Sequence, residues 1–325
     1  MVVVNLLETV IDLDAIATNT RILKNLVQPA QLMCVVKADG YNHGAIPVAR
    51  TVLANGADQL GVATLAEALE LREAGITAPI LCWIWSPEQD FAAALDANIH
   101  LAVVSMAHAQ AIVKYAAGKP EKLVQTTIKI DTGLHRSGVD ESQWEAVFTL
   151  LKDAGTATGN IEVTGVMSHL ACADEPGNPA NDTQAAAFNR AIALGRKLGL
   201  ELPVNHLSNS PAVLTCPDFY HDMVRPGLAV YGYSPLADGN DYGLQPAMSW
   251  VGKVTVVKPI EPGEGTSYNL TWRAAKPGYL AVIPAGYADG LPRRAQNHVE
   301  VTIGGHRYPQ VGRICMDQFV IDLGD

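Results

Sequence analysis

Residues 33–44 read Met33-Cys34-Val35-Val36-Lys37-Ala38-Asp39-Gly40-Tyr41-Asn42-His43-Gly44. The apolar start of this stretch predicts a short buried strand with Lys37 at its end, followed by a polar turn. A lysine in an apolar strand is rarely buried without a partner, and its amine loses basicity when desolvated. A neutral amine can form a covalent Schiff base with an aldehyde. The alternative is that Lys37 covers a sheet edge with its apolar stem while its charge reaches solvent.

Strand-like apolar runs alternate with helix-like segments from this stretch to about residue 233. Eight strands are predicted, at Met33–Ala38, Gln59–Ala63, Ile80–Ile84, His100–Ser105, Leu123–Ile130, Val163–His169, Val204–Ser208 and Met223–Val230. Thr64 with Glu67 three residues later is a capping-box pattern that begins a helix. Such alternation indicates a parallel sheet, and eight units fit a (β/α)8 barrel. A doubly wound open sheet is the alternative, although no G-x-G-x-x-G follows a strand.

The pattern changes after Pro235, where helical periodicity ends. Strands are predicted at Ser249–Val257, Gly278–Ile283, Val299–Ile303, Arg307–Val311 and Phe319–Leu323, with Gly304-Gly305 as a hairpin turn. We therefore predict an α/β protein with an N-terminal (β/α)8 TIM-like barrel domain, residues 1–235, and a mostly β C-terminal domain, residues 236–325. Because the chain stops directly after its last strand, we expect an open sheet edge there.

Composition and charge narrow the function classes. The 325-residue chain has a net charge of −10, which argues against a nucleic-acid partner because phosphate binding needs excess lysine and arginine. No apolar run of about 18 residues is present, so no membrane span is expected. The N-terminus lacks the basic flank and cleavage site of a signal peptide. Five scattered cysteines without a C-x-x-C pair predict a reducing compartment, the cytoplasm, and no zinc or other metal site.

Polar residues gather at the predicted strand ends, which in a barrel share the face that holds active sites. They are Lys37, Tyr41, Lys129, Asp131, Arg136, His169, Asn209, Ser210 and Arg225, the last followed closely by Gly227 and Leu228. Taken singly, His169 could be a core histidine, and Lys129 with Asp131 could be a structural ion pair. Their joint occurrence at one face favours a site.

The loops after the seventh and eighth strands, where barrels often bind phosphate, have suitable residues. Asn209 and Ser210 offer polar groups, and Pro211 suits the first turn of a helix whose free N–H groups face an anion. Gly227 lets backbone N–H groups approach closely. A lysine for an aldehyde and a cradle for a phosphate together predict pyridoxal 5'-phosphate.

The stretch Val35–Gly44 resembles the pyridoxal-phosphate attachment signature of bacterial alanine racemases, a fold-type III family. Further motifs follow in the family's order at Lys129-Ile130-Asp131-Thr132-Gly133, Arg136, Met167-Ser168-His169, Asn209-Ser210, Arg225-Pro226-Gly227, Ser267-Tyr268, Gly286-Tyr287-Ala288-Asp289-Gly290 and Gly312-Arg313-Ile314-Cys315-Met316-Asp317. The resemblance implies racemisation of L- and D-alanine, which supplies D-alanine for peptidoglycan. It also implies a head-to-tail homodimer in which each site is completed by the partner's β domain.

Roles for single residues follow from the same resemblance. Lys37 would hold the cofactor covalently and serve as one of two bases, and Tyr268 of the partner subunit would be the second. Arg225 would hydrogen-bond the pyridine nitrogen, and His169 would pack against the ring. The phosphate would lie among Tyr41, Asn209, Ser210, Gly227 and Leu228. Arg136, backed by Lys129, would orient the cofactor's phenolic oxygen and the substrate carboxylate. Met316 of the partner subunit would help bind that carboxylate, with Tyr287 lining the entrance. In several family members the lysine that matches Lys129 carries a carbamate.

Several alternatives remain open. Tyr268 and Tyr287 could be ordinary loop tyrosines, and Met316 a core residue. The enzyme could be a serine or broad-specificity amino-acid racemase. A related decarboxylase typically has a cysteine in place of this tyrosine chemistry, and a non-catalytic pyridoxal-phosphate-binding barrel lacks a second domain. Family chains usually continue for several tens of residues beyond Gln318, so we expect the β domain to be incomplete, apparently truncated.

Overall fold

The computed structural model describes residues 5–325, which form two compact units. One unit spans residues 12–247, and the other joins the residues up to 11 to residues 248–325. The predicted boundary lay near residue 235 and assigned the N-terminus to the barrel; residues 1–4 of that assignment lie outside the described part. The division differs because β1 (Leu7–Ile11) pairs antiparallel with β9 (Met248–Gly252).

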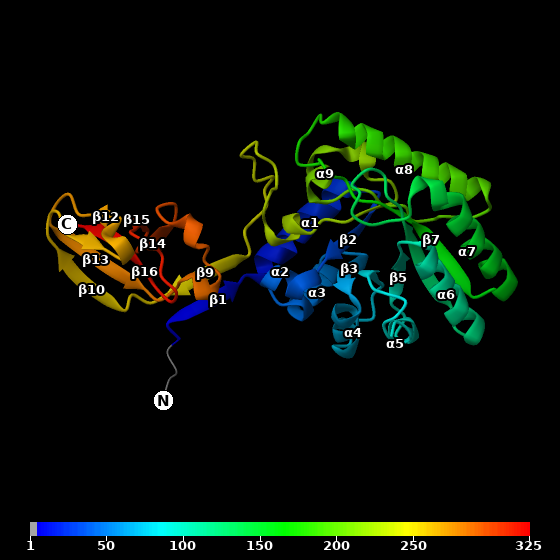
Figure 1. Ribbon diagram of the computed structural model, residues 1–325, viewed down its shortest axis with the longest axis horizontal. Coiled ribbons are helices and arrows are strands. Elements are labelled where there is room, and N and C mark those ends of the chain that lie inside the picture. Colours follow the sequence, from blue (N-terminus) through cyan, green and yellow to red (C-terminus); the bar gives the residue numbers. More distant parts are fainter. Residues whose placement is uncertain (1–4) are drawn as a thin grey trace. The chain divides into compact units, whose positions relative to one another are not determined.

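The larger unit is built on a curled parallel sheet whose strands pair in the order β7-β6-β5-β4-β3-β2-β8 (Figure 1). The bounds are β2 (Gln31–Val35), β3 (Gln59–Thr64), β4 (Ile80–Ile84), β5 (His100–Val103), β6 (Val124–Lys129), β7 (Ile161–Met167) and β8 (Met223–Val224). Apolar side chains from five strands fill its interior, at Met33, Leu81, Ala102, Met167 and Met223. This interior is a packed core, as in other barrels of this size.

An extended segment that begins at Val204 occupies the remaining position between β7 and β8. The N–H groups of Val204 and His206 donate to carbonyl oxygens of β7, and the N–H of Arg225 donates to the carbonyl of Ser208 on the other side. Gly165 permits this approach, because a Cβ there would lie 1.8 Å from the carbonyl oxygen of Val204. The predicted barrel architecture is confirmed, with seven regular strands and this bonded segment as the eighth.

Helices cover the outside of the sheet (Figure 1). They are α1 (Leu13–Val27), α3 (Ala45–Ala54), α4 (Leu65–Glu73), α5 (Ala92–Asp96), α6 (Met106–Gly118), α7 (Trp144–Thr158), α8 (Pro179–Lys197) and α9 (Ser210–Thr215). The predicted capping box is present at the start of α4, where Thr64 and Glu67 satisfy each other's backbone N–H groups. Among residues 5–325, no helix is both long enough and apolar enough to cross a membrane.

Two predicted strands of the barrel extend three or more residues too far at their carboxyl ends. The first stops at Val35 and not at Ala38, because residues 38–42 form a left-handed turn with φ between 51° and 64°, inside the segment α2 (Lys37–Asn42). The left-handed conformation costs about 1–2 kcal/mol for each residue other than glycine. The last barrel strand stops at Val224, because Pro226 lacks the N–H that would continue the ladder.

The second unit is mostly β, as predicted, with an antiparallel sheet in the order β10-β13-β16-β15-β14. The bounds are β10 (Val256–Ile260), β11 (Gly265–Thr266), β12 (Trp272–Arg273), β13 (Gly278–Ile283), β14 (Glu300–Ile303), β15 (His306–Val311) and β16 (Phe319–Gly324). The hairpin at Gly304-Gly305 is confirmed by the pairing of β14 with β15. The expectation of an open edge beside the last strand is wrong, because β16 lies in the middle of the sheet.

Candidate active site

The carboxyl ends of the barrel strands surround a cavity of about 670 Å³. Its walls include all the barrel residues predicted to contact a cofactor or substrate, namely Lys37, Tyr41, Arg136, His169, Asn209, Ser210, Arg225, Gly227 and Leu228, together with Lys129. These residues come from five separate stretches of the sequence. The parallel strand order brings them together, because all strands end at the same face.

Lys37 directly precedes the left-handed turn, and its amine lies 5.9 Å from the centre of the Tyr41 ring. The turn is fixed to the neighbouring strand–helix unit, since the N–H of Ala38 donates to the Glu67 carboxylate over 3.0 Å. The lysine therefore starts from an anchored backbone at the wall of the cavity.

Tyr41, Ser210 and Gly227 form a compact polar cluster on one side of the cavity. A Cβ placed on Gly227 would lie 2.3 Å from the hydroxyl oxygen of Tyr41, so a larger residue there would displace that hydroxyl. The hydroxyl oxygen of Ser210 accepts from the N–H groups of Gly227 and Ala229 at 2.9 and 3.2 Å. Burial raises the pKa of Tyr41, which keeps its hydroxyl protonated as a donor. Hydroxyl and backbone N–H groups of this kind suit phosphate oxygens.

Arg225 forms the floor of the cavity and is only 5 % exposed. Its two terminal nitrogens donate to Nδ1 and the carbonyl of His206 and to the carbonyls of Ser168 and Leu207. Among residues 5–325, no carboxylate forms an ion pair with Arg225. Its Nε–H is the one guanidinium group that has no hydrogen-bond acceptor within these residues. Burial lowers its pKa to about 9, which leaves the guanidinium charged at neutral pH.

The remaining groups add to the positive charge. Burial and the nearby Arg136 and Arg225 lower the pKa of Lys129 to about 8, against the opposing effect of Asp131. Lys129 donates to the hydroxyl of Ser137. Burial and the surrounding cations, Arg225 first, lower the pKa of His169 to about 3, so this ring is neutral. The cavity is thus a cationic site, complementary to an anionic ligand.

The three predicted residues of the second unit lie on loops that contact one another. The N–H groups of Tyr287 and Ala288 donate to the carbonyls of Cys315 and Met316 at 3.1 and 2.9 Å. A Cβ on Gly312 would lie 2.9 Å from the carbonyl of Thr266, in the loop that carries Tyr268. Tyr268 is 66 % exposed, Met316 53 % and Tyr287 43 %. The alternative of a buried Met316 is wrong for this unit.

The sequence prediction did not name several cavity residues. Trp83 near the end of β4 and Trp85 just after it line the wall, and His108 at the start of α6 lies beside them. The Trp85 ring packs 4.6 Å from that of His108. The strand-end argument applies to these residues too, but aromatic residues in an apolar run resemble core residues. Glu67 and His43, which hold the turn, were likewise given no role in the site.

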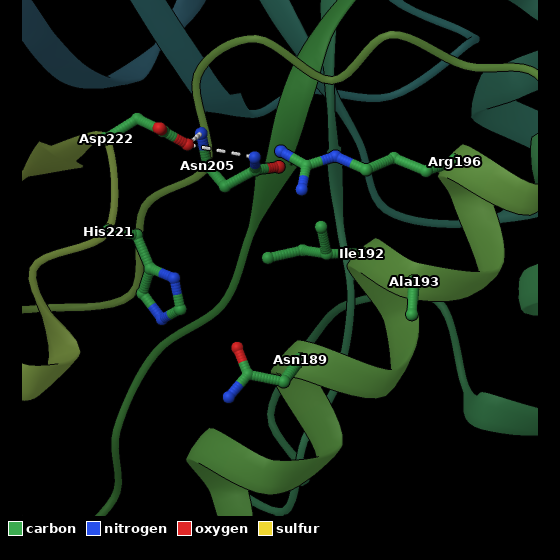
Figure 2. Close-up of a pocket in the computed structure, with 7 residues that line it drawn as sticks. All are labelled: Asn189, Ile192, Ala193, Arg196, Asn205, His221 and Asp222. Carbon is green, nitrogen blue, oxygen red and sulfur yellow. Dashed lines mark hydrogen bonds between the residues drawn. The ribbon is translucent and has the colours of Figure 1, made fainter.

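A second pocket, of about 310 Å³, lies at the opposite ends of the strands (Figure 2). Figure 2 shows Arg196 and other side chains of α8 on one wall and Asn205, His221 and Asp222 on the other. The Asp222 carboxylate accepts from the N–H and the amide of Asn205 at 2.8 and 2.9 Å. These polar groups join the segment after Val204 to the turn before β8. The pocket contains none of the predicted site residues.

The chain matches two family models, the N-terminal domain of alanine racemase over residues 11–235 and the C-terminal domain over residues 247–325. It is 64% identical to the alanine racemase of Corynebacterium efficiens over 321 residues, covering 99% of this chain and 86% of that protein. A crystal structure of alanine racemase from Corynebacterium glutamicum is 58% identical, with a TM-score of 0.87 and coverage of 99% and 86%. Alanine racemase from Bartonella henselae, with covalently bound pyridoxal phosphate, is 28% identical, with a TM-score of 0.87 and coverage of 99% and 87%.

Proposed function

The chain belongs to the alanine racemase family, and we propose that it interconverts L-alanine and D-alanine with pyridoxal 5'-phosphate as its cofactor. Members of this family are isomerases that act on amino acids. The observation that carries the proposal is the meeting of Lys37, the cluster of Tyr41, Ser210 and Gly227, and the buried Arg225 in one cavity.

The residues of the cavity fit this cofactor. The close approach of Tyr41 to Gly227 leaves a narrow cluster of hydroxyl and N–H donors, suited to the phosphate. Asn209 and Leu228 would complete that cluster. The free Nε–H of Arg225 can donate to a ring nitrogen, and an arginine does not give up its proton readily. The amine of Lys37 supplies the covalent attachment, and the neutral His169 can lie against an aromatic ring.

Racemisation needs two proton-transfer groups on opposite faces of the substrate's Cα. Bound pyridoxal phosphate withdraws electrons from the amino acid and so makes its α-proton acidic. Nζ of Lys37 would remove or return the proton on one face. The hydroxyl of Tyr268 of the partner subunit would do so on the other. The side chain of Tyr268 is 66 % exposed, which leaves it available to enter the site of a second chain.

The proposed enzyme is therefore a homodimer with shared sites. Arg136, with Lys129 behind it, and Met316 of the partner subunit would bind the substrate carboxylate, and Tyr287 would line the entrance. A carbamate on Lys129 would place a negative charge beside Arg136 and Arg225. The lowered pKa of Lys129 supports this, because only the neutral amine reacts with carbon dioxide.

We infer a role in the supply of D-alanine for peptidoglycan, in the cytoplasm. The proposed location is supported by the sequence, in which five scattered cysteines without a C-x-x-C pair suit a reducing compartment. The net charge of the chain, −10, does not support binding to a nucleic acid or a membrane.

The test is incubation of the purified protein and pyridoxal phosphate with L-alanine in deuterated water. We expect D-alanine that carries deuterium at Cα. Ethylamine would identify a decarboxylase, and binding without exchange would identify a non-catalytic protein. L-serine racemised with a similar kcat/KM would indicate a broad-specificity racemase. The Lys37→Ala variant is the control, and a covalent, borohydride-trappable cofactor in that variant would place the attachment elsewhere.

A further inference from the structure

We propose that His43 is a positioning residue, which holds the left-handed turn in the shape that presents Lys37 and Tyr41 to the cofactor. The inference rests on the proposed function for the identity of that ligand. The role of His43 itself follows from its contacts in the barrel unit.

The proton of the His43 ring can be assigned from its neighbours. Nδ1 lies 3.1 Å from the carbonyl oxygen of Gly40 and 2.8 Å from that of Tyr41. Carbonyl oxygens only accept hydrogen bonds, so Nδ1 must carry the proton and donate to both. Nε2 is buried without a hydrogen-bond partner among the described residues. The tautomer of the neutral ring is therefore the one with the proton on Nδ1.

The hydrogen bonds of His43 act on strained backbone. Four residues of the turn other than glycine have positive φ, at Ala38, Asp39, Tyr41 and Asn42. Such a conformation persists only when its surroundings hold it in place. His43 ties together the carbonyl groups of Gly40 and Tyr41, one on either side of the Cα of Tyr41. The side chain thereby fixes the segment that carries the phosphate-side tyrosine.

The ring of His43 also supports Tyr41 through a third aromatic residue. The centres of the His43 and Tyr231 rings are 4.6 Å apart, and those of Tyr231 and Tyr41 are 4.7 Å apart. The hydroxyl of Tyr231 donates over 3.0 Å to the carbonyl of Val35, two residues before Lys37. A displacement of the His43 ring would therefore shift the residues at both ends of the turn. The hydroxyl of Tyr41 has no room to adjust on the Gly227 side.

The test compares His43→Asn, whose amide can donate from nearly the position of Nδ1, with His43→Leu, which fills the space without a donor. His100→Leu, at the amino end of β5, is the control for loss of a largely buried histidine. Amide hydrogen exchange is measured on the cofactor-free protein at Gly40 and Gly44, whose N–H groups donate to the carbonyls of Val36 and Asp39 and so span the two ends of the turn. Binding of pyridoxal phosphate is measured separately by equilibrium dialysis.

We expect His43→Leu to accelerate exchange at these amides and weaken cofactor binding by about tenfold or more, as the loss of a buried hydrogen bond implies, whereas His43→Asn stays within about threefold of the wild type. Equal losses in both variants would assign the effect to ring packing and overturn the proposal, as would unchanged exchange in His43→Leu.

The tautomer provides a second measurement on the unmodified protein, so the proposal stays testable even if His43→Leu does not fold. Nitrogen-15 shifts of His43 should report a protonated Nδ1, and a protonated Nε2 with a free Nδ1 would overturn the assignment. If the wild type binds no pyridoxal phosphate while exchange still depends on His43, the proposed function fails and the positioning role stands.

Discussion

The hydroxyl oxygen of Tyr41 lies against the backbone of Gly227, so closely that a Cβ on the glycine would be 2.3 Å from it. The two residues are far apart in the sequence, but they follow β2 and β8, which pair with each other where the barrel closes. Pairing of β2 with β8, which closes the sheet, therefore brings Tyr41 and Gly227 into contact.

Gly227→Ala should disturb this contact with little effect on the fold. The φ of Gly227 is −110°, outside the left-handed region that favours glycine, so the main expected effect is displacement of Tyr41. We expect pyridoxal-phosphate affinity to fall by about tenfold or more, as for a misplaced binding group. The control is Gly118→Ala, because no atom lies within 4 Å of a Cβ at that position. Equal affinity in the two variants would show that the Tyr41–Gly227 contact does not serve the cofactor.

Tyr268→Phe tests the two-base proposal, because it removes the hydroxyl and keeps the ring. We expect loss of the α-proton from L-alanine to slow by about 10²–10⁴, the usual contribution of a positioned acid or base, and far less loss for D-alanine. Exchange of the α-hydrogen with deuterated water measures each direction separately. Tyr279→Phe is a matched control, since Tyr279 is also exposed in the same unit. Equal losses for both enantiomers would contradict the assignment.

Mixed dimers test whether the sites are shared. Lys37→Ala and Tyr268→Phe chains should each be inactive alone. After the subunits exchange, half of the dimers should contain one chain of each variant. Each of these mixed dimers has one intact site out of two, so the sample should show roughly a quarter of wild-type activity. No recovery, in a sample whose mixed dimers are verified by mass spectrometry, would mean that each site is built from one chain.

Glu67 joins the start of α4 to the turn that carries Lys37. Its two carboxylate oxygens accept from the N–H groups of Ala38, Ala63 and Thr64 at 2.8 to 3.1 Å. Glu67→Gln has a single acceptor oxygen, so we expect a loss of about 1–2 kcal/mol in the free energy of unfolding, measured in urea. Glu70→Gln on the same helix is the control, and no difference between them would rule out this anchoring role.

The barrel and the location of its site could be predicted from the sequence, because both depend on periodicity and on the rule that parallel strands end at one face. Lys37, Arg225 and the phosphate-side cluster were found in this way, and all line the cavity. The left-handed turn could not be predicted. It runs through four residues other than glycine, and it is anchored by Glu67, a tertiary contact that no local pattern records, besides the local hydrogen bonds of His43.

The pairing of β1 with β9 was missed for a similar reason. Strands at Leu7–Ile11 and Met248–Gly252 are separated by the whole barrel, and no local pattern records which distant strand a terminal strand joins. Trp83 was missed because its chemistry is ambiguous, since an aromatic residue at a strand end fits a core as well as a ligand wall.

Lys129 should make the stability of the protein depend on pH in a predictable direction. Burial and neighbouring cations lower its pKa from the ordinary 10.5 to about 8, so between these values the unfolded chain binds a proton that the folded chain lacks. The free energy of unfolding therefore rises with pH over this window, as the cost of burying the charge disappears. We subtract the free energy of unfolding of Lys129→Met from that of the wild type. In buffer free of carbon dioxide, this difference should increase from pH 8 to pH 10.5.

Comparison with Lys129→Met isolates this group, because the other lysines and the tyrosines titrate in both proteins and cancel. Urea denaturation at a series of pH values gives the difference directly. A flat or falling difference would show that Lys129 keeps an ordinary pKa in the folded chain. Addition of ¹³C-bicarbonate should then produce a carbamate resonance in the wild type and none in Lys129→Met, because the lowered pKa supplies the neutral amine that reacts.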